Sequence, residues 1–174
     1  EISHFFWKRF REAVKAVKKN MLIIGEIWHY AGDFLEGDEW DTVMNYPFYL
    51  NMIDLLAEEK INVSRFVQNL GYLKGRLNKK CYPLMWNLID SHDTARFLHL
   101  CNNNKKKQHL AAAFQLLLPG MPMIYYGDEF AMPGANDPDC RRGMNWDEDY
   151  QDKEMFEWYK QLLKVRKNHA CIEE

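Results

Sequence analysis

Uninterrupted apolar runs, rather than strict alternation of apolar and polar residues, mark the strands of this chain. The clearest run covers residues 21–26 and follows a helical pattern, which predicts a central parallel strand covered on both faces. Two more runs of this character lie at residues 84–89 and 121–126, and a short strand is expected at residues 42–45. Because parallel strands carry their chemistry at their carboxyl ends, the polar residues after these runs are the candidates for a site.

Apolar residues spaced three and four positions apart predict helices before, between and after these strands. The first such pattern ends near Asn20, and others cover residues 47–56, 64–77 and 105–118. A closing helix is predicted around residues 156–166. The faces expected to be buried in the last two helices consist of Leu110, Ala113, Phe114 and Leu117, and of Phe156, Tyr159, Leu163 and Arg166.

Strands that alternate with helices predict parallel pairing through right-handed crossovers, in either a small open sheet or half of an eight-stranded barrel. Three of the strands end in segments that bear carboxylates: Glu26, Asp93, and the pair Asp128 and Glu129. Carboxylates at the same end of several strands favour a barrel with one active face. A whole barrel needs about 250 residues, so the 174 residues of this chain correspond to roughly half of one.

Composition limits the kinds of molecule that this chain is expected to bind. The formal net charge of −2 gives no reason to expect binding to nucleic acid or to an anionic membrane surface. No apolar run approaches the roughly 20 residues that a membrane span needs. Aromatic residues make up 14% of the chain, a surplus that suits a site for flat, partly apolar ligands such as sugar rings.

The first residue and the cysteines give expectations about the parent protein and its compartment. It begins with Glu1 rather than Met, and a helical pattern starts almost at once, so we expect a piece of a longer protein. The four cysteines are widely scattered and form no C-x-x-C pair. This distribution favours reduced thiols in a cytoplasmic protein over a disulfide framework.

Glu26 and Asp93 are the first candidates for chemistry. They are far apart in the sequence, but two strand ends of one barrel would bring them together. Paired carboxyls meet the needs of glycosidic bond cleavage, in which one group protonates the leaving oxygen and another stabilises an oxocarbenium-like centre. The alternative is that Glu26 caps a helix or pairs with an arginine such as Arg96.

A metal centre is a second interpretation of the same strand ends. His29, His92 and Asp93 are plausible ligand types, and metal-dependent hydrolases also use strand ends of barrels. Such sites usually contain an H-x-H pair or H-E-x-x-H, and neither pattern occurs in this sequence. We therefore expect no metal site and no cofactor.

Five segments occur in a fixed order along the chain. They are GEIWH at residues 25–29, VMNY at 43–46, NLIDSHDTARF at 87–97, MIYYGDE at 123–129 and DPDCRR at 137–142. The first, third and fourth resemble successive signature motifs of the alpha-amylase family of glycoside hydrolases. The other two narrow the resemblance to its neopullulanase, cyclomaltodextrinase and maltogenic amylase branch. The likeness covers essentially the whole chain.

This resemblance implies the C-terminal half of a (β/α)8 TIM barrel, with residues 1–174 as one partial catalytic domain. It also implies a retaining reaction on α-glucosidic bonds, with Glu26 as the general acid/base. Asp93 would bind ring hydroxyls and favour a distorted sugar. Asp128 and Glu129 are expected to order a loop rather than to act in catalysis. The substrate-binding residues implied by position are His92, Trp28, Asp137, Arg141 and Glu1.

The resemblance places the nucleophilic aspartate on the strand before Glu1, so the chain alone is expected not to turn over substrate. The expected substrates are maltooligosaccharides, cyclodextrins or pullulan, with sugar transfer as a further outcome. An oligo-1,6-glucosidase or another α-glucosidase, and a non-catalytic carbohydrate-binding barrel, remain open alternatives. Because half a barrel leaves two sheet edges unpaired, self-association is also expected.

Overall fold

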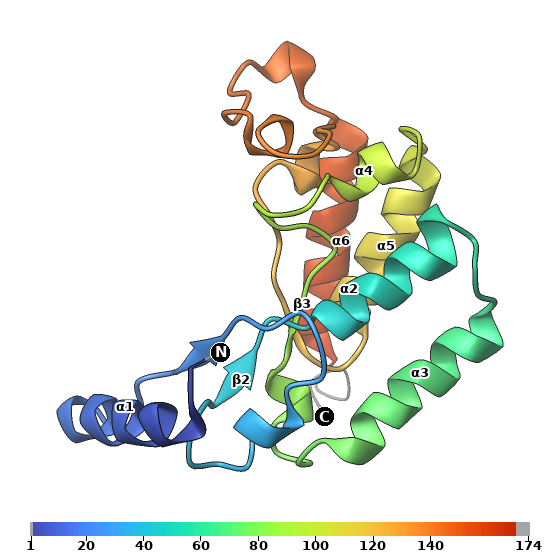
Figure 1. Ribbon diagram of the computed structural model, residues 1–174. Helices are drawn as coiled ribbons and strands as arrows, with labels where there is room; N and C mark the ends of the chain where they lie inside the picture. The colour runs from blue at the N-terminus through green and yellow to red at the C-terminus, as the bar shows by residue number, and fades with distance from the viewer. Residues whose placement is uncertain (1, 170–174) are drawn as a thin grey trace.

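The computed structural model describes residues 2–169, and helices and parallel strands alternate along them (Figure 1). A single π-helical turn, Ile53–Ala57, extends the second helix. A long segment without regular strands connects the last strand to the last helix, shown in orange in Figure 1. The elements are α1 (His4–Val17), β1 (Ile24–Gly25), β2 (Thr42–Val43), α2 (Tyr46–Met52), α3 (Val63–Arg76), β3 (Trp86–Asn87), α4 (Phe97–Leu100), α5 (Lys105–Leu117), β4 (Met121–Pro122) and α6 (Lys153–Asn168).

The four strands lie side by side in the order in which they occur in the sequence, and all pair in parallel. β1 pairs with β2, and β3 pairs with β4. A parallel bridge between Met44 and Trp86 joins the two pairs. Sequential order with parallel pairing is the arrangement of consecutive strands in a (β/α)8 barrel. The predicted fold class, part of such a barrel with about four parallel strands, is confirmed.

The strands are shorter than the apolar runs that predicted them, and amide side chains add hydrogen bonds between neighbouring segments at their ends. The Asn45 side chain donates to Asn87 Oδ1 at 2.8 Å, and the Asn87 side chain donates to the carbonyl of Pro119 at 3.0 Å. Gln115 donates from α5 to the carbonyl of Met123 at 2.6 Å. These polar links supplement the backbone hydrogen bonds between the strands.

The prediction of a central strand at residues 21–26 is wrong for the part of the chain that the structure describes. There β1 pairs on one side alone, with β2, and the side chains of Met21, Leu22 and Ile24 are exposed. Helix α1, which precedes it, contains no buried residue. An apolar run predicts burial, but it does not show what covers the strand.

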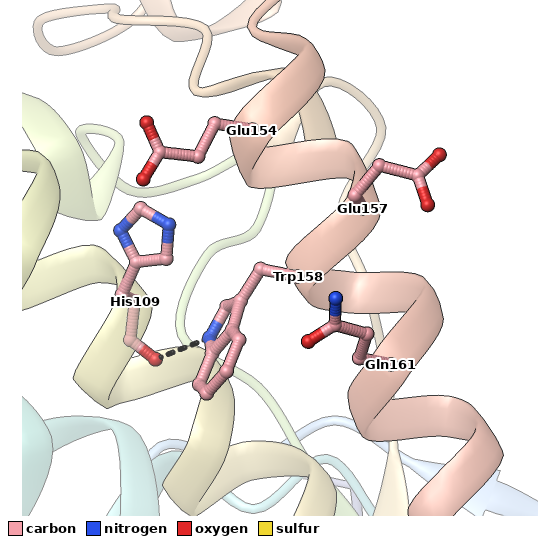
Figure 2. Close-up of a pocket in the computed structure, with 5 residues that line it drawn as sticks. All are labelled: His109, Glu154, Glu157, Trp158 and Gln161. Atoms are coloured by element: carbon pink, nitrogen blue, oxygen red, sulfur yellow. Dashed lines mark hydrogen bonds between the residues drawn. The ribbon is translucent and has the colours of Figure 1, made fainter.

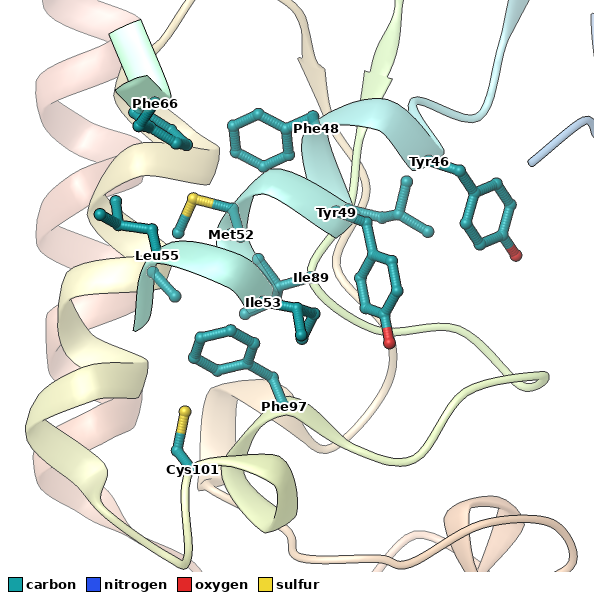
Figure 3. Close-up of a cluster of buried hydrophobic side chains, with 12 residues drawn as sticks. Tyr46, Phe48, Tyr49, Met52, Ile53, Leu55, Phe66, Ile89, Phe97 and Cys101 are labelled. Atoms are coloured by element: carbon teal, nitrogen blue, oxygen red, sulfur yellow. The ribbon is translucent and has the colours of Figure 1, made fainter. Parts of the chain in front are cut away.

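The largest hydrophobic cluster packs α2 and the turn after it against the segment that follows β3 (Figure 3). Leu88 and Ile89 enter this cluster directly before Asp90, and Phe97 and Cys101 enter it just after the turn at residues 91–95. The segment that carries His92 and Asp93 is therefore anchored in the core on both sides.

The buried faces of the last two helices differ from the predicted ones. In α5 the predicted residues Ala113, Phe114 and Leu117 are only partly buried and Leu110 is exposed, whereas the buried residues are Gln108, Ala111, Ala112, Gln115 and Leu116. Two glutamines face inward because they bind backbone carbonyls there, so apolar spacing alone selected the wrong face. In α6 Tyr159 and Arg166 are buried as predicted, whereas Met155 and Leu162 take the places expected for Phe156 and Leu163.

Candidate active site

The Tyr46 hydroxyl connects the two strand ends that carry the candidate carboxylates. It donates a hydrogen bond to Glu26 Oε1 at 3.1 Å and lies 3.2 Å from Ser91 Oγ. Ser91 Oγ in turn accepts the backbone N–H of Asp93 at 3.2 Å. A short chain of hydrogen bonds thus runs from Glu26, after β1, through the start of α2, to Asp93, after β3.

Tyr46 is fully buried and lies in the electric field of both carboxylates. Burial raises the pKa of Tyr46 to about 12, and the negative charges of Glu26 and Asp93 also raise it, against a lowering by the Ser91 hydroxyl. The phenol is therefore a protonated donor near neutral pH. Sequence reasoning assigned no role to Tyr46, although it lies three residues after the end of β2, near the same edge as Glu26 after β1.

Trp28 provides an aromatic surface beside Glu26. Its indole stacks on the Tyr46 ring with ring centroids 4.3 Å apart and an interplanar angle of 12°. The Trp28 side chain is still 44% exposed, so one part of it remains accessible. An accessible aromatic face next to a carboxylate is a suitable surface for the apolar face of a sugar ring.

Arg141 contacts three other candidate residues: His92, Asp93 and Asp137. Its guanidinium forms ion pairs with Asp93 at 3.2 Å and with Asp137 at 2.8 Å, and it donates to the His92 carbonyl at 2.9 Å. The His92 ring nitrogen Nε2 lies 3.3 Å from Asp93 Oδ1. All four side chains are between 37% and 56% exposed, so a ligand can reach them.

The alternative in which Glu26 pairs with Arg96 does not fit the structure. Arg96 is fully buried and forms its ion pair with Asp128, at 3.2 Å. Glu129 accepts the backbone N–H of Gly127 at 2.8 Å. Asp128 and Glu129 thus both bind groups of their own loop or of a neighbouring segment.

Other predicted features can be placed more briefly. Glu1 lies outside the described residues. Within residues 2–169, Cys81, Cys101 and Cys140 are free thiols, and no group of three or more His, Cys, Asp or Glu residues is arranged to hold a metal ion. The metal-dependent interpretation through His29 and His92 therefore has no support among these residues. No helix in the same range is long and apolar enough to cross a membrane.

A hollow of about 420 Å³ lies apart from the candidate carboxylates (Figure 2). Trp158 and Glu154 of α6 face His109 of α5 across it, and the Trp158 indole donates to the His109 carbonyl at 2.9 Å. None of the candidate residues lines this hollow. The candidate site is instead the open surface formed by the strand ends.

Comparison with known proteins shows the family of the chain. The model of the family described as "Alpha amylase, catalytic domain" matches residues 2–151. The matched stretch contains all the candidate residues except Glu1. The chain therefore belongs to the alpha-amylase family, and the resemblance read from its motifs is confirmed.

Individual relatives place it within one branch of that family. A cyclomaltodextrinase of Thermoanaerobacter pseudethanolicus is 47% identical over 169 residues, 97% of this chain. Neopullulanase 2 of Thermoactinomyces vulgaris is 45% identical over 172 residues, 99% of this chain. The chain spans 29% of the length of each of these relatives.

A solved structure extends the similarity to three dimensions. The cyclic alpha-maltosyl-(1→6)-maltose hydrolase from Arthrobacter globiformis, in complex with the sugar of its name, superposes with a TM-score of 0.97. The two are 31% identical, and the match covers 99% of this chain and 39% of the hydrolase.

Proposed function

We propose that this chain is the C-terminal half of a (β/α)8 catalytic domain, residues 1–174, in a retaining glycoside hydrolase that cleaves α-glucosidic bonds. The observation that carries the proposal is the hydrogen-bonded link from Glu26 through Tyr46 and Ser91 to Asp93. It connects the Glu26 carboxyl, next to the accessible Trp28 ring, to the backbone of Asp93 at another strand end. The expected substrates are maltooligosaccharides, cyclodextrins or pullulan.

Glu26 is proposed as the general acid/base. A retaining reaction needs a group that first protonates the leaving oxygen and then accepts a proton from water. Tyr46 suits this role because its neutral hydroxyl orients the Glu26 carboxyl through a hydrogen bond. Trp28, stacked on Tyr46, is proposed to hold the sugar on the leaving-group side.

Asp93 is proposed as the carboxylate that binds ring hydroxyls and favours a distorted sugar. Its ion pair with Arg141 holds it at the strand end, where a carboxylate can stabilise an oxocarbenium-like centre. His92 would bind the same sugar, and Asp137 and Arg141 would hold sugars further along the chain of the substrate. Glu1 is proposed to touch the acceptor sugar.

The nucleophile is proposed to be an aspartate encoded before Glu1, as the family resemblance implies. A polypeptide limited to residues 1–174 should then bind α-glucan without turning it over, because the covalent glycosyl intermediate cannot form. Kinetic experiments therefore need the complete polypeptide, meaning the whole product of the gene that encodes this chain.

Glu26→Gln in the complete polypeptide tests the proposal. The amide keeps the shape and the hydrogen bond to Tyr46 but cannot donate the proton, so kcat should fall by about 10² to 10⁴-fold while maltooligosaccharide binding persists. Glu36→Gln, at an exposed glutamate of the following loop, is the matched control and should leave kcat unchanged. A near-normal kcat for Glu26→Gln would remove Glu26 from the acid role.

Two other functions are distinguished by simple measurements. An oligo-1,6-glucosidase or other α-glucosidase would act on isomaltose in preference to cyclodextrin and pullulan, and the products formed from these three substrates separate the cases. The same analysis reports sugar transfer as products longer than the substrate. A non-catalytic carbohydrate-binding barrel would bind these sugars, and its Glu26→Gln variant would behave as the wild type.

Self-association and location complete the proposal. The exposed Met21, Leu22 and Ile24 along β1 favour pairing of this edge with a second copy of residues 1–174. Light scattering that shows a monodisperse monomer would contradict this. A cytoplasmic location is supported by the three unpaired thiols and is tested by cell fractionation.

A further inference from the structure

The turn that carries His92 and Asp93 is closed by hydrogen bonds at both of its ends. Asp90, directly before the turn, accepts the backbone N–H of Phe97 at 2.6 Å, just after it. Inside the turn the Ser91 backbone N–H donates to Thr94 Oγ1 at 3.1 Å. These bonds fix the shape of residues 91–95, but they do not by themselves fix where the turn lies relative to the other strand ends.

Arg96 supplies that second connection. Its side chain is fully buried, and Nη1 donates to the Tyr126 carbonyl at 2.8 Å and contacts Asp128 Oδ1 at 3.2 Å. The guanidinium lies 4.6 Å from the ring centroid of Tyr125 and 4.9 Å from that of Tyr126. One side chain from the β3 end is therefore held by charge, hydrogen bond and ring contact at the β4 end.

The backbone of Arg96 reaches a third segment. Its N–H donates to the Gly134 carbonyl at 2.9 Å. Gly134 starts the loop that supplies Asp137 and Arg141, and a Cβ built on Gly134 would come within 3.0 Å of the backbone of residues 139 and 140. Arg96 is thus the point where the three segments around Asp93 meet.

A fully buried arginine needs compensating charge, and two aspartates lie beside it. Burial raises the pKa of Asp128 to about 7 and that of Asp90 well above its ordinary value, the latter aided by the charge of Asp128. Asp90 Oδ2 and Asp128 Oδ2 have no hydrogen-bond partner among the other described residues. A protonated Asp90 can donate a hydrogen bond to Asp128 and so satisfy both oxygens. One neutral and one ionised carboxyl then balance the single positive charge of Arg96.

We propose that Arg96, held between Asp128 and the rings of Tyr125 and Tyr126, is the positioning residue that sets His92 and Asp93 in place relative to Glu26. Arg96 itself is fully buried and touches no substrate. It acts through the turn, and this inference rests on the proposed hydrolysis of α-glucan. The reacting groups must be held to within a fraction of an ångström, because a displacement of about 1 Å costs on the order of 10²-fold in rate.

Arg96→Lys in the complete polypeptide is the test. Lysine keeps the charge but loses the planar fork, so it cannot satisfy the Tyr126 carbonyl and Asp128 with the same geometry. With the folded fraction measured by circular dichroism, kcat per folded molecule should fall about 10- to 100-fold with KM nearly unchanged. Arg9→Lys, at an exposed arginine of α1, is the matched control and should keep the wild-type kcat.

Each outcome decides between positioning and a purely structural role. If Arg96→Lys lowers the melting temperature but keeps the wild-type kcat per folded molecule, the positioning role is overturned. Should Arg96→Lys not fold, Asp128→Asn serves instead, because it keeps the volume and removes the charge that orients Arg96; the same fall in kcat is expected, and a normal kcat overturns the proposal.

Failure of the proposed function would be visible separately. It would appear as a wild-type polypeptide that cleaves no α-glucan. In that case the dissociation constant for maltoheptaose replaces kcat as the measure. A rise of about tenfold in Arg96→Lys would support the positioning of His92 and Asp93, and an unchanged constant would overturn it.

Discussion

The two strand ends that carry the candidate carboxylates are held in different ways. Glu26, after β1, accepts a hydrogen bond from the neutral Tyr46 hydroxyl, on a strand with exposed apolar side chains. Asp93, after β3, lies in a turn that is flanked by Asp90 and Arg96, and both of these residues are almost completely buried. Arg96 carries a positive charge, and Asp90 retains a proton because burial raises its pKa. One end is oriented by a neutral donor, and the other is tied into a buried ionic cluster.

The difference matches the two proposed roles. A group that both gives and accepts a proton is best served by a neutral neighbour, since a nearby fixed charge would favour one protonation state. A carboxylate that is proposed to stabilise a positively charged sugar can instead be placed among charged side chains, as Asp93 is beside Arg141. The two ends should therefore respond differently to substitution, and three changes test this.

Arg96→Met should produce the largest loss of stability. It removes one partner of a buried ion pair and leaves Asp128 and the Tyr126 carbonyl without their donor. We expect the free energy of unfolding of residues 1–174 to fall by about 3–5 kcal/mol. Urea titration followed by circular dichroism measures it. Arg9→Met at an exposed position should change it by less than about 0.5 kcal/mol, and equal effects would contradict the comparison.

The same cluster should make stability depend on pH. Burial keeps a proton on Asp90 in the folded state, because the pKa of Asp90 is raised well above its ordinary value, whereas the unfolded chain releases this proton near pH 4. The stability that this proton contributes is thus fully present below about pH 4 and is lost as the pH rises toward the raised pKa of Asp90, by at most about 1.4 kcal/mol per pH unit.

Asp90→Asn isolates that dependence. The amide stays neutral and can still donate to Asp128, so the fall in stability between pH 4 and 7 should become shallower. Arg96, Glu129, Tyr159 and Tyr125 also face the cluster and remain unchanged in this variant. Unfolding curves at pH 5 and pH 7 for both proteins measure the effect. An unchanged slope would show that the shared proton is not its source.

Sequence reasoning located the strand ends because their signal is local. An apolar run followed by polar residues is visible in one segment, and it led to Glu26 and Asp93 without any knowledge of neighbours. The fold class followed from the order of such segments. The motifs then supplied His92 and Arg141, which the structure brings together around Asp93.

Sequence reasoning did not predict the contacts of the buried polar side chains. Tyr46, Arg96 and Gln115 all face inward to satisfy groups on distant segments, and no periodicity of apolar residues reports such a need. The difference between the predicted and the observed buried face of α5 has the same cause. The exposed edge of β1 shows the opposite error: apolar residues there were predicted to be buried, but nothing among the described residues covers them.

Tyr46→Phe should have the smallest effect on stability of the three. It removes the hydroxyl that joins Glu26 to Ser91 but keeps the ring stacked on Trp28. The loss should be about 1–2 kcal/mol in residues 1–174, the cost of leaving a buried hydrogen-bonding partner unsatisfied. Because Glu26 then loses its orienting donor, kcat of the complete polypeptide should fall while sugar stacking on Trp28 keeps KM nearly unchanged. Tyr72→Phe, at an exposed tyrosine, is the control. If Tyr46→Phe destabilised the chain as much as Arg96→Met, the contrast between a neutral link at the β1 end and an ionic one at the β3 end would not hold.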